Sequence, residues 1–379
     1  MSGPLSGVRV LELAGLGPGP FAAMLLADMG ADVIRVDRVA QRGAGSAGGI
    51  VGRGRRSIAV DLKHPDGRAV VLDLVAGSDV LVEAFRPGVT ERLGLGPDDC
   101  LAVNPRLVYG RMTGWGQDGP LAPSAGHDIG YIAVTGALHA SRRAGDRPVP
   151  PMNLLGDLGG GALYFAFGIV CALWQVERSD QGQVIDAAIV DGTASLTNLI
   201  LDLRAMGDWS GPPGGNLLDS GAPFYEVYAC ADGAELAVGA LEPKFYAELL
   251  RLTGAAAAEL APDVRMDPTT WPAAKERWAQ LFATRSRAQW LSLLEGTDAC
   301  VAPVLSWDEA PRHPHLAARG TFVERDGVVQ AAPAPRFSRT PATLPRSAAS
   351  YGQHTDEVLR QVGRSAEQIE QLRSSGAVT

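Results

Sequence analysis

The order of apolar and polar residues predicts that the chain begins with a parallel α/β sheet. Apolar runs of strand length occupy residues 8–14 and 32–37. Between them, a turn of glycine and proline at 15–20 leads into residues 21–29, which have helical composition with Pro20 at a permitted first-turn position. Strand, turn, helix and strand in this order are typical of a parallel sheet with helices on its faces.

The same alternation continues to about residue 206. It predicts helices at 67–76, from Thr90, at 161–176 and at 193–206, and strands at 79–83, 107–112 and 183–190. The run 161–176 is too short to span a bilayer and is predicted to be a buried helix. A long loop, 113–129, follows one of the strands, and loops at strand ends are where open α/β sheets bind ligands.

The pattern changes near residue 207 and predicts a second, smaller α+β domain. Residues 208–221 are rich in glycine and proline, alternating residues at 225–230 and 235–240 predict a hairpin, and helices follow to residue 294. Residues 311–345 are again loop-like, and 355–372 predict a terminal helix or pair with Thr355 as N-cap. The predicted limits are 1–206, completed by 331–379, for the large α/β domain, 207–221 for a linker, 222–308 for the small domain and 309–330 for a return linker.

Composition indicates a soluble, cytoplasmic protein. The chain has 379 residues, 46% of them hydrophobic, and a net charge of −8, which argues against nucleic acid or an anionic membrane as a partner. No secretory signal is evident at the N-terminus. The four cysteines have neither CxxC spacing nor histidine partners, so we expect reduced thiols and no metal: Cys100, Cys171, Cys230 and Cys300.

One stretch, residues 35–68, is basic in this acidic chain. It holds eight Arg or Lys against three Asp, and its glycines between 43 and 54 predict a loop. The stretch is either a solvated charged surface or a phosphate-binding patch, because Arg and Lys supply the donors that polyphosphates need. The basic residues are Arg35, Arg38, Arg42, Arg53, Arg55, Arg56, Lys63 and Arg68.

The common nucleotide and hydrolase motifs are absent. The turn after the first strand resembles a dinucleotide fingerprint, with Asp37 closing the next strand, but its third glycine would fall at Pro20, and Pro18 removes a backbone N–H. Nicotinamide and flavin binding are therefore disfavoured. There is no G-x-x-x-x-G-K-[ST], G-x-S-x-G or H-E-x-x-H sequence, which argues against P-loop enzymes, serine esterases and zinc hydrolases.

His127 and Asp157 are the candidate catalytic pair. Each lies among glycines and apolar residues, which is unusual for a titratable group. Taken alone, Asp157 fits a helix N-cap, His127 a loop residue bonded to backbone, and Glu242 a solvated turn residue. The glycines that follow Asp157 are expected to expose N–H groups of a helix start, which could approach an oxyanion.

Taken together, these motifs resemble the family III CoA-transferase superfamily and, within it, the α-methylacyl-CoA racemases. The likeness covers nearly the whole chain. It is carried by residues 4–13, 30–37, 56–63, 82–94, 113–120, 125–129, 221–225 and 353–359.

The resemblance implies a Rossmann-like large domain, a small domain and an interlocked homodimer whose active sites lie between one chain's large domain and the other's small domain. It implies an acyl-CoA substrate and no further cofactor. The CoA contacts that it implies are Arg38, Val60, Lys63, Ala84, Phe85, Arg86 and Arg92.

The resemblance also implies an isomerase that inverts the α-carbon of 2-methylacyl-CoA thioesters. His127 and Asp157 would exchange the roles of base and acid, with Glu242 orienting His127 and Asp128 supporting the site. Asp157 must then hold a proton near neutral pH, so burial must raise its pKa. The alternatives are a CoA transferase with Asp157 as nucleophile, in which a histidine at 127 has little purpose, and a non-catalytic acyl-CoA binder.

Overall fold

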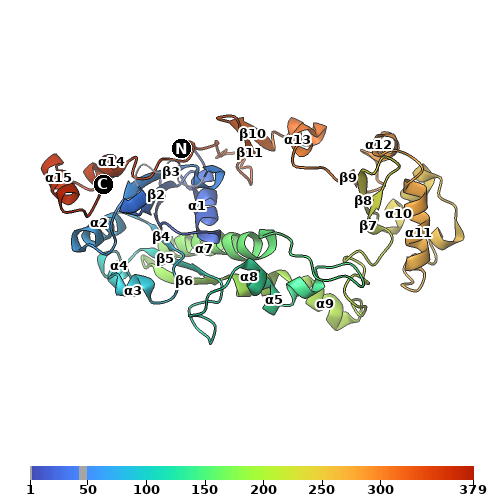
Figure 1. Cartoon of the computed structure of the whole chain (residues 1–379), viewed down its shortest axis with the longest axis horizontal. Helices are drawn as coiled ribbons and strands as arrows, with labels where there is room; N and C mark the ends of the chain where they lie inside the picture. Colours follow the sequence, from blue (N-terminus) through green and yellow to red (C-terminus); the bar gives the residue numbers. More distant parts are fainter. Residues whose placement is uncertain (1, 42–48) are drawn as a thin grey trace. The chain divides into compact units, whose positions relative to one another are not determined.

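The computed structural model describes residues 2–41 and 49–379 (Figure 1). The chain forms two compact units. The first comprises Met1–Thr135, Met152–Leu196 and Gly320–Thr379, and the second Gly136–Pro151 and Thr197–Arg319. This division differs from the predicted limits, because residues 136–151 and 197–206 group with the second unit and residues 320–330 with the first.

A six-stranded parallel sheet forms the centre of the first unit, in the order β3-β2-β1-β4-β5-β6. The predicted α/β class with a parallel sheet is confirmed. The sequence pattern missed β3, which lies inside the basic stretch that was expected to be largely loop. The strands are β1 (Arg9–Leu13), β2 (Asp32–Asp37), β3 (Arg55–Ala59), β4 (Val80–Glu83), β5 (Val108–Thr113) and β6 (Gln183–Ala188).

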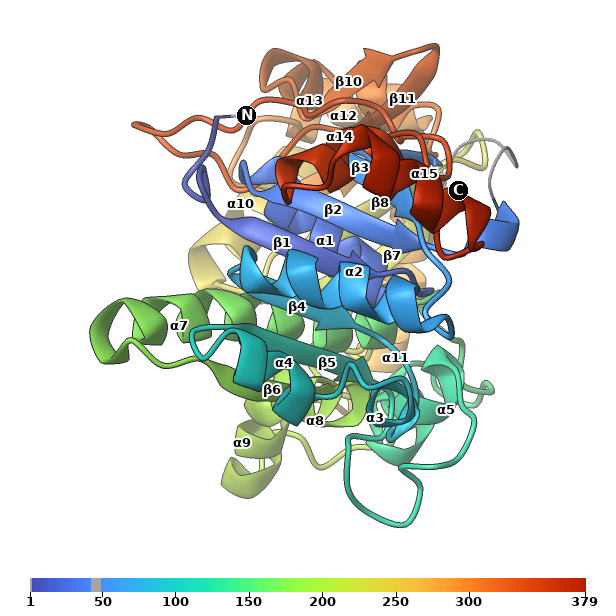
Figure 2. The same ribbon diagram turned by 90° about the vertical axis from the view of Figure 1, so that its left-hand side faces the viewer.

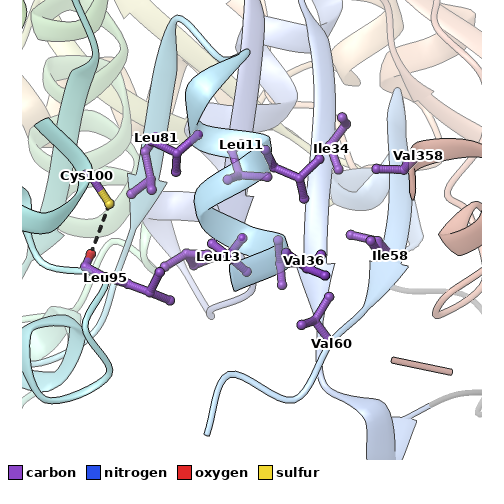
Figure 3. Close-up of a cluster of buried hydrophobic side chains, with 14 of the residues drawn as sticks. Leu11, Leu13, Ile34, Val36, Ile58, Val60, Leu81, Leu95, Cys100 and Val358 are labelled. Carbon is purple, nitrogen blue, oxygen red and sulfur yellow. Dashed lines mark hydrogen bonds between the residues drawn. The ribbon is translucent and has the colours of Figure 1, made fainter. Parts of the chain in front are cut away.

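Helices cover both faces of this sheet, as Figure 2 shows. One face packs on α2 (Pro65–Ala76), α4 (Pro97–Val103), α14 (Thr355–Gln361) and α15 (Ala366–Ser374), through the apolar cluster drawn in Figure 3. The other face packs on α1 (Pro18–Asp28), α5 (Asp128–Val134) and α7 (Tyr164–Ser179). The remaining elements of this unit are α3 (Val89–Arg92), α8 (Ile189–Leu196), the short helices η1 (Val39–Gln41) and η2 (Gly49–Gly52), and the hairpin β10 (Phe322–Arg325) and β11 (Val328–Ala331).

The second unit has an antiparallel sheet and an aromatic core. The predicted hairpin is confirmed as β7 (Tyr225–Ala229) and β8 (Glu235–Gly239), to which β9 (Val301–Pro303) adds a third strand. Its core is built around buried tryptophan, tyrosine and phenylalanine side chains. Its helices are α6 (Ala137–Ala140), α9 (Asn198–Met206), α10 (Pro243–Thr253), η4 (Ala258–Leu260), α11 (Trp271–Phe282), α12 (Arg287–Leu294), η5 (Ala310–Arg312) and α13 (Pro314–Ala318).

The long apolar helix differs from its prediction. It begins as a π-helix, η3 (Leu154–Leu163), and continues as α7, so its 26 residues are long and apolar enough to cross a membrane by length and composition. The expectation of a short, buried helix is therefore wrong. One stripe is buried against the sheet, and the opposite stripe is exposed: Phe165, Ile169, Ala172 and Val176 are buried, whereas Leu163, Phe167, Val170 and Trp174 are exposed.

Glycines allow the π-helix to lie against α8 at backbone contact. A Cβ on Gly192 would overlap the carbonyl of Gly160, and a Cβ on Gly160 would overlap Thr193. Neither glycine lies in the left-handed region, so their small size, and not conformational freedom, is what these positions require. The contact holds η3 close against α8.

We predict that Gly192→Ala destabilises the fold, because the added methyl group forces α8 away from η3. Overpacking of this kind costs about 1–3 kcal/mol in the free energy of unfolding, measured by denaturant titration. Gly130→Ala is the matched control. Gly130 lies in α5 with open space where its Cβ would be, so helix propensity should leave stability equal or higher. Equal effects of the two substitutions would contradict the packing argument.

Candidate active site

Asp157 lies in the first turn of the π-helix and is half-buried. Its backbone N–H donates to Oδ1 of Asp128 over 2.7 Å. The residue that caps the helix is Asn153, so the N-cap interpretation of Asp157 is wrong. π-turns inside helices are frequent at functional sites, because they displace a side chain from the regular helical path.

His127 and Asp128 stand where the predicted loop meets α5. His127 is the exposed N-cap of this helix and Asp128 is its first residue. Gly156 makes the approach of η3 possible, since a Cβ there would overlap Oδ1 of Asp128 and lie 2.8 Å from the Ile132 side chain. The structure therefore brings His127, Asp128 and Asp157 together at the starts of two helices.

The surroundings of Asp157 favour its neutral form. Burial raises the pKa of its carboxyl group above the ordinary value, and the negative charge of Asp128 raises it further. A hydrogen bond from Asn153 and the charge of His127 oppose the rise without cancelling it. Burial was expected to raise this pKa, but the carboxylate of Asp128 is a contribution that the sequence did not reveal.

Tyr131 belongs to the site although the sequence gave it no role. Its ring is buried and meets Trp115 edge-on, with centroids 4.7 Å apart. Burial and the charge of Asp157 raise the pKa of the Tyr131 phenol, and the charge of Arg86 lowers it, so the phenol lies within the field of both groups. The sequence did hold a signal for this role: Tyr131 follows His127 by four residues, and this spacing puts two side chains on the same side of a helix.

The glycines after Asp157 have a different role from the one expected. Residues 159–161 lie inside the π-helix and not at its start, so their N–H groups belong to the helix interior. Gly160 and Gly161 approach α8 and α1 closely. The N–H groups that a helix start leaves without intrahelical partners are those before Asp157.

A cavity of about 650 Å³ begins beside Asp157. Gly17 lines it, and Oδ2 of Asp157 lies 3.7 Å from where a Cβ on Gly17 would be. Asn153 and Leu158, on either side of Asp157, line it as well, and Arg38 lies further along. The cavity thus connects the neighbourhood of the candidate catalytic pair with one of the predicted CoA contacts.

A smaller hollow of about 280 Å³ gathers basic side chains where β3 leads into α2. Lys63 and Arg92, both predicted CoA contacts, line it. His64 and Arg68 line it too. Four basic groups around one hollow are the type of site that binds phosphate groups.

Half of the basic stretch is committed to ion pairs within the unit. Four of its arginines are buried and paired with carboxylates, so the interpretation of the whole stretch as one phosphate-binding patch is wrong. Arg42 lies outside the described residues. The pairs are Arg35 with Asp37, Arg53 with Asp28, Arg55 with Glu12, and Arg56 with Asp32 and Glu357.

The other predicted CoA contacts lie at the carboxyl edge of neighbouring strands. Val60 is buried just after β3, and Ala84, Phe85 and Arg86 follow β4. The carboxylate of Glu83 accepts from the N–H of Phe85 over 2.7 Å and from Arg111, which fixes the loop at this edge. The structure therefore places these contacts where open α/β sheets bind their ligands.

Glu242 lies in the second unit. It is exposed and is the N-cap of α10, just before Pro243. Its charge raises the pKa of the Cys300 thiol in the same unit, second to burial. Its predicted action on His127 stays a prediction.

Acidic, cysteine and histidine side chains form no cluster that could hold a metal ion in residues 2–41 and 49–379. All four cysteines are free thiols. This part of the chain does place three groups together: the carboxyl group of Asp157, whose pKa is raised, the imidazole of His127 and the carboxylate of Asp128. Such a set can donate and accept protons.

The fold and the site define the class of protein. The chain belongs to CoA-transferase family III, whose sequence profile matches residues 5–355. A solved CAIB/BAIF family protein from Brucella suis has the same fold, with a TM-score of 0.79 and 26% identity over 96% of this chain and 100% of that one.

Two relatives of known function show the chemistry that occurs in this family. An alpha-methylacyl-CoA racemase of Mus musculus is 47% identical, over 99% of this chain and 97% of the relative. A succinyl-CoA–D-citramalate CoA-transferase of Chloroflexus aurantiacus is 31% identical, over 94% of this chain and 93% of the relative.

We predict that Asp128→Asn lowers the pKa of Asp157, because it removes the neighbouring negative charge and keeps an oxygen that can accept the Asp157 N–H. This pKa is measured from acid–base titration curves of two proteins, Asp128→Asn and the double variant Asp128→Asn, Asp157→Asn; the difference between the curves is the titration of Asp157. The same subtraction for the wild type and Asp157→Asn gives the pKa of Asp157 when Asp128 is present. Asp66→Asn, on the exposed side of α2, should leave the pKa unchanged, and an unchanged value in Asp128→Asn would refute the argument.

Proposed function

We propose that this protein is a racemase that inverts the α-carbon of 2-methylacyl-CoA thioesters by 1,1-proton transfer. The observation that carries the proposal is the pairing of His127 with Asp157, whose pKa is raised. The high identity to an alpha-methylacyl-CoA racemase supports the same reaction. The reaction class is that of an isomerase.

Inversion at a C–H centre requires a base on one face of the carbon and an acid on the other. In one direction neutral His127 removes the α-proton and the protonated carboxyl of Asp157 delivers a proton to the opposite face. In the other direction Asp157 removes the proton and protonated His127 delivers one. The raised pKa of Asp157 increases the fraction of the protonated carboxyl that the first direction requires, and the charge of Asp128 adds to that rise.

The α-proton of a thioester has a pKa of roughly 20, so the base can remove it only if the enolate is stabilised. Hydrogen-bond donors aimed at the thioester oxygen supply a few kcal/mol. The first turn of η3, before Asp157, offers N–H groups of this kind. The glycines after Asp157 were expected to be these donors. In the proposed mechanism the backbone N–H groups of the residues before Asp157 donate instead.

The CoA part of the substrate would lie along the carboxyl edge of the sheet. The basic hollow around Lys63 and Arg92 suits its phosphates, and the larger cavity leads from Arg38 to Asp157. We expect no cofactor beyond the substrate, because proton transfer needs only the acid and the base.

A CoA transferase is the second candidate, because relatives of about 30% identity carry that activity. There Asp157 would attack the thioester carbonyl as a carboxylate, and a raised pKa would reduce the fraction of this nucleophile. His127 would have no assigned step. Both features favour the racemase.

We also propose an interlocked homodimer, as the family resemblance implies, as the working form. The support is the exposed stripe of α7, where Phe167 and Trp174 are 68% and 61% exposed in the single chain. A helix that is apolar on two opposite sides needs a packing partner on both. A second copy of the chain would cover the outer stripe.

We predict that the wild-type protein incubated with (R)-2-methylacyl-CoA in D2O incorporates deuterium at the α-carbon and loses chirality, as NMR and chiral chromatography would show. His127→Ala should slow racemisation by about 10²–10⁴-fold, because one of the two proton-transfer groups is lost. His315→Ala, in the second unit, is the control and should act as wild type. Transfer of CoA to an added free acid, without α-exchange, would instead establish the transferase.

We predict that light scattering gives twice the chain mass of 39.7 kDa for the wild type. Phe167→Glu should give a folded species of lower mass, since a charge in the apolar stripe opposes its burial. Glu177→Gln, on the same helix, should remain a dimer. A monomeric wild type would rule out the proposed assembly.

A further inference from the structure

One buried arginine contacts both ends of the segment that carries most of the predicted CoA contacts. The segment runs from Glu83, the last residue of β4, to the end of α3. Arg111 lies on the neighbouring strand β5, opposite Glu83 in the ladder, and is 7% exposed. Four of the seven predicted contacts belong to this segment: Ala84, Phe85, Arg86 and Arg92.

At the first end of the segment, Arg111 holds the carboxylate of Glu83. Its Nε donates to Oε1 of Glu83 over 2.9 Å, and Oε2 of Glu83 accepts from the N–H of Phe85 over 2.7 Å. The Glu83 side chain is fully buried. Burial raises the pKa of Glu83, and the Phe85 N–H and the charge of Arg111 oppose that rise. Arg111 thus favours the ionised carboxylate, which binds the Phe85 N–H more strongly than the neutral acid would.

At the other end of the segment, Arg111 holds the carboxylate of Glu91. Its Nη1 donates to Oε1 over 2.7 Å, and its Nη2 donates to Oε2 over 3.4 Å. The Glu91 side chain is 44% exposed, so this pair contributes little to stability. The two-point contact does fix the direction of the carboxylate. Glu91 immediately precedes Arg92, which lines the basic hollow with Lys63.

The segment between these two contacts has little means of holding its own position. It turns at Gly88, which lies in the left-handed region with φ of 78° and precedes α3. α3 has only four residues, and a helix of that length is not stable by itself. The position of the segment therefore depends on its contacts with the sheet, and Arg111 provides one at each end.

We propose that Arg111 is a positioning residue that holds both ends of segment 83–92 and so preorganises its side chains for CoA. The inference rests on the proposed function, because the CoA contacts belong to it. Arg111 takes no part in proton transfer. The segment would contact the CoA moiety equally in the bound substrate and in the transition state, so loss of Arg111 should raise KM and leave kcat unchanged.

The first test is Arg111→Lys in the full chain. Lysine keeps the positive charge, but its single ammonium group cannot reproduce the fork that binds two carboxylates at once. Isothermal titration calorimetry with free CoA gives Kd, and α-exchange of a 2-methylacyl-CoA in D2O gives KM and kcat. We expect Kd and KM to rise about tenfold or more, because the segment must then be ordered on binding. A fall in kcat with KM unchanged would overturn the inference.

Glu91→Ala tests the second contact and leaves the buried pair of Arg111 with Glu83 in place. It should raise Kd for CoA while the free energy of unfolding, measured by denaturant titration, stays near the wild-type value. The substitution should weaken binding less in the Arg111→Lys background than in the wild type, because both changes remove the same contact. Glu91→Ala alone decides the matter if Arg111→Lys does not fold.

Arg56→Lys is the matched control. Arg56 is also a buried strand arginine paired with two carboxylates, but these are Asp32 at the start of β2 and Glu357 in α14. The substitution should lower stability and leave Kd for CoA unchanged. An unchanged Kd in Arg111→Lys or in Glu91→Ala, or an equal loss of affinity in Arg56→Lys, would overturn the inference, while CoA binding by the wild type still supports the proposed function. A wild type that binds no CoA would reject both.

Discussion

The close packing of the π-helix against its two neighbours is the constraint on which the site depends. Gly156 and Gly160 face α5 and α8, and a methyl group on either would overlap its neighbour. Only at this distance can Asp128 accept the N–H of Asp157. That hydrogen bond fixes the turn, and the same carboxylate supplies the negative charge that favours a neutral Asp157. The same close packing therefore sets both the position of Asp157 and the charge that acts on its carboxyl group.

The distribution of buried charge separates structural arginines from those that are free to bind. A buried ion pair adds little net stability, because desolvation of both groups offsets their attraction, but loss of one partner is costly. Arg53, Arg55 and Arg56 each join segments distant in the sequence in this way. The exposed basic groups, such as Lys63 and Arg92, remain for phosphate. The incomplete pair at Glu12 differs from these because one oxygen has no donor among the described residues.

Asp157 suits either of the two candidate reactions. As a carboxylate it would be a nucleophile, and as a neutral acid it would be a proton donor. The environment decides which form prevails. Burial and the neighbouring Asp128 favour the acid in this chain, and His127 is the proposed complementary base. A single geometric change, the position of one carboxylate beside another, thus biases the chemistry.

Much of the fold was determined by local sequence. The strands Asp32–Asp37 and Val80–Glu83 and the hairpin near residue 230 follow from short apolar patterns whose period matches their structure. His127 and Asp157 could be found because polar residues among glycines are conspicuous, although their pairing came from the resemblance to a family. The strand Arg55–Ala59 was hidden, because two arginines in a buried strand contradict the pattern unless distant carboxylates neutralise them. Tertiary structure alone decided the π-turn, the role of the glycines and the charge that acts on Asp157, since each depends on contacts between residues far apart in the chain.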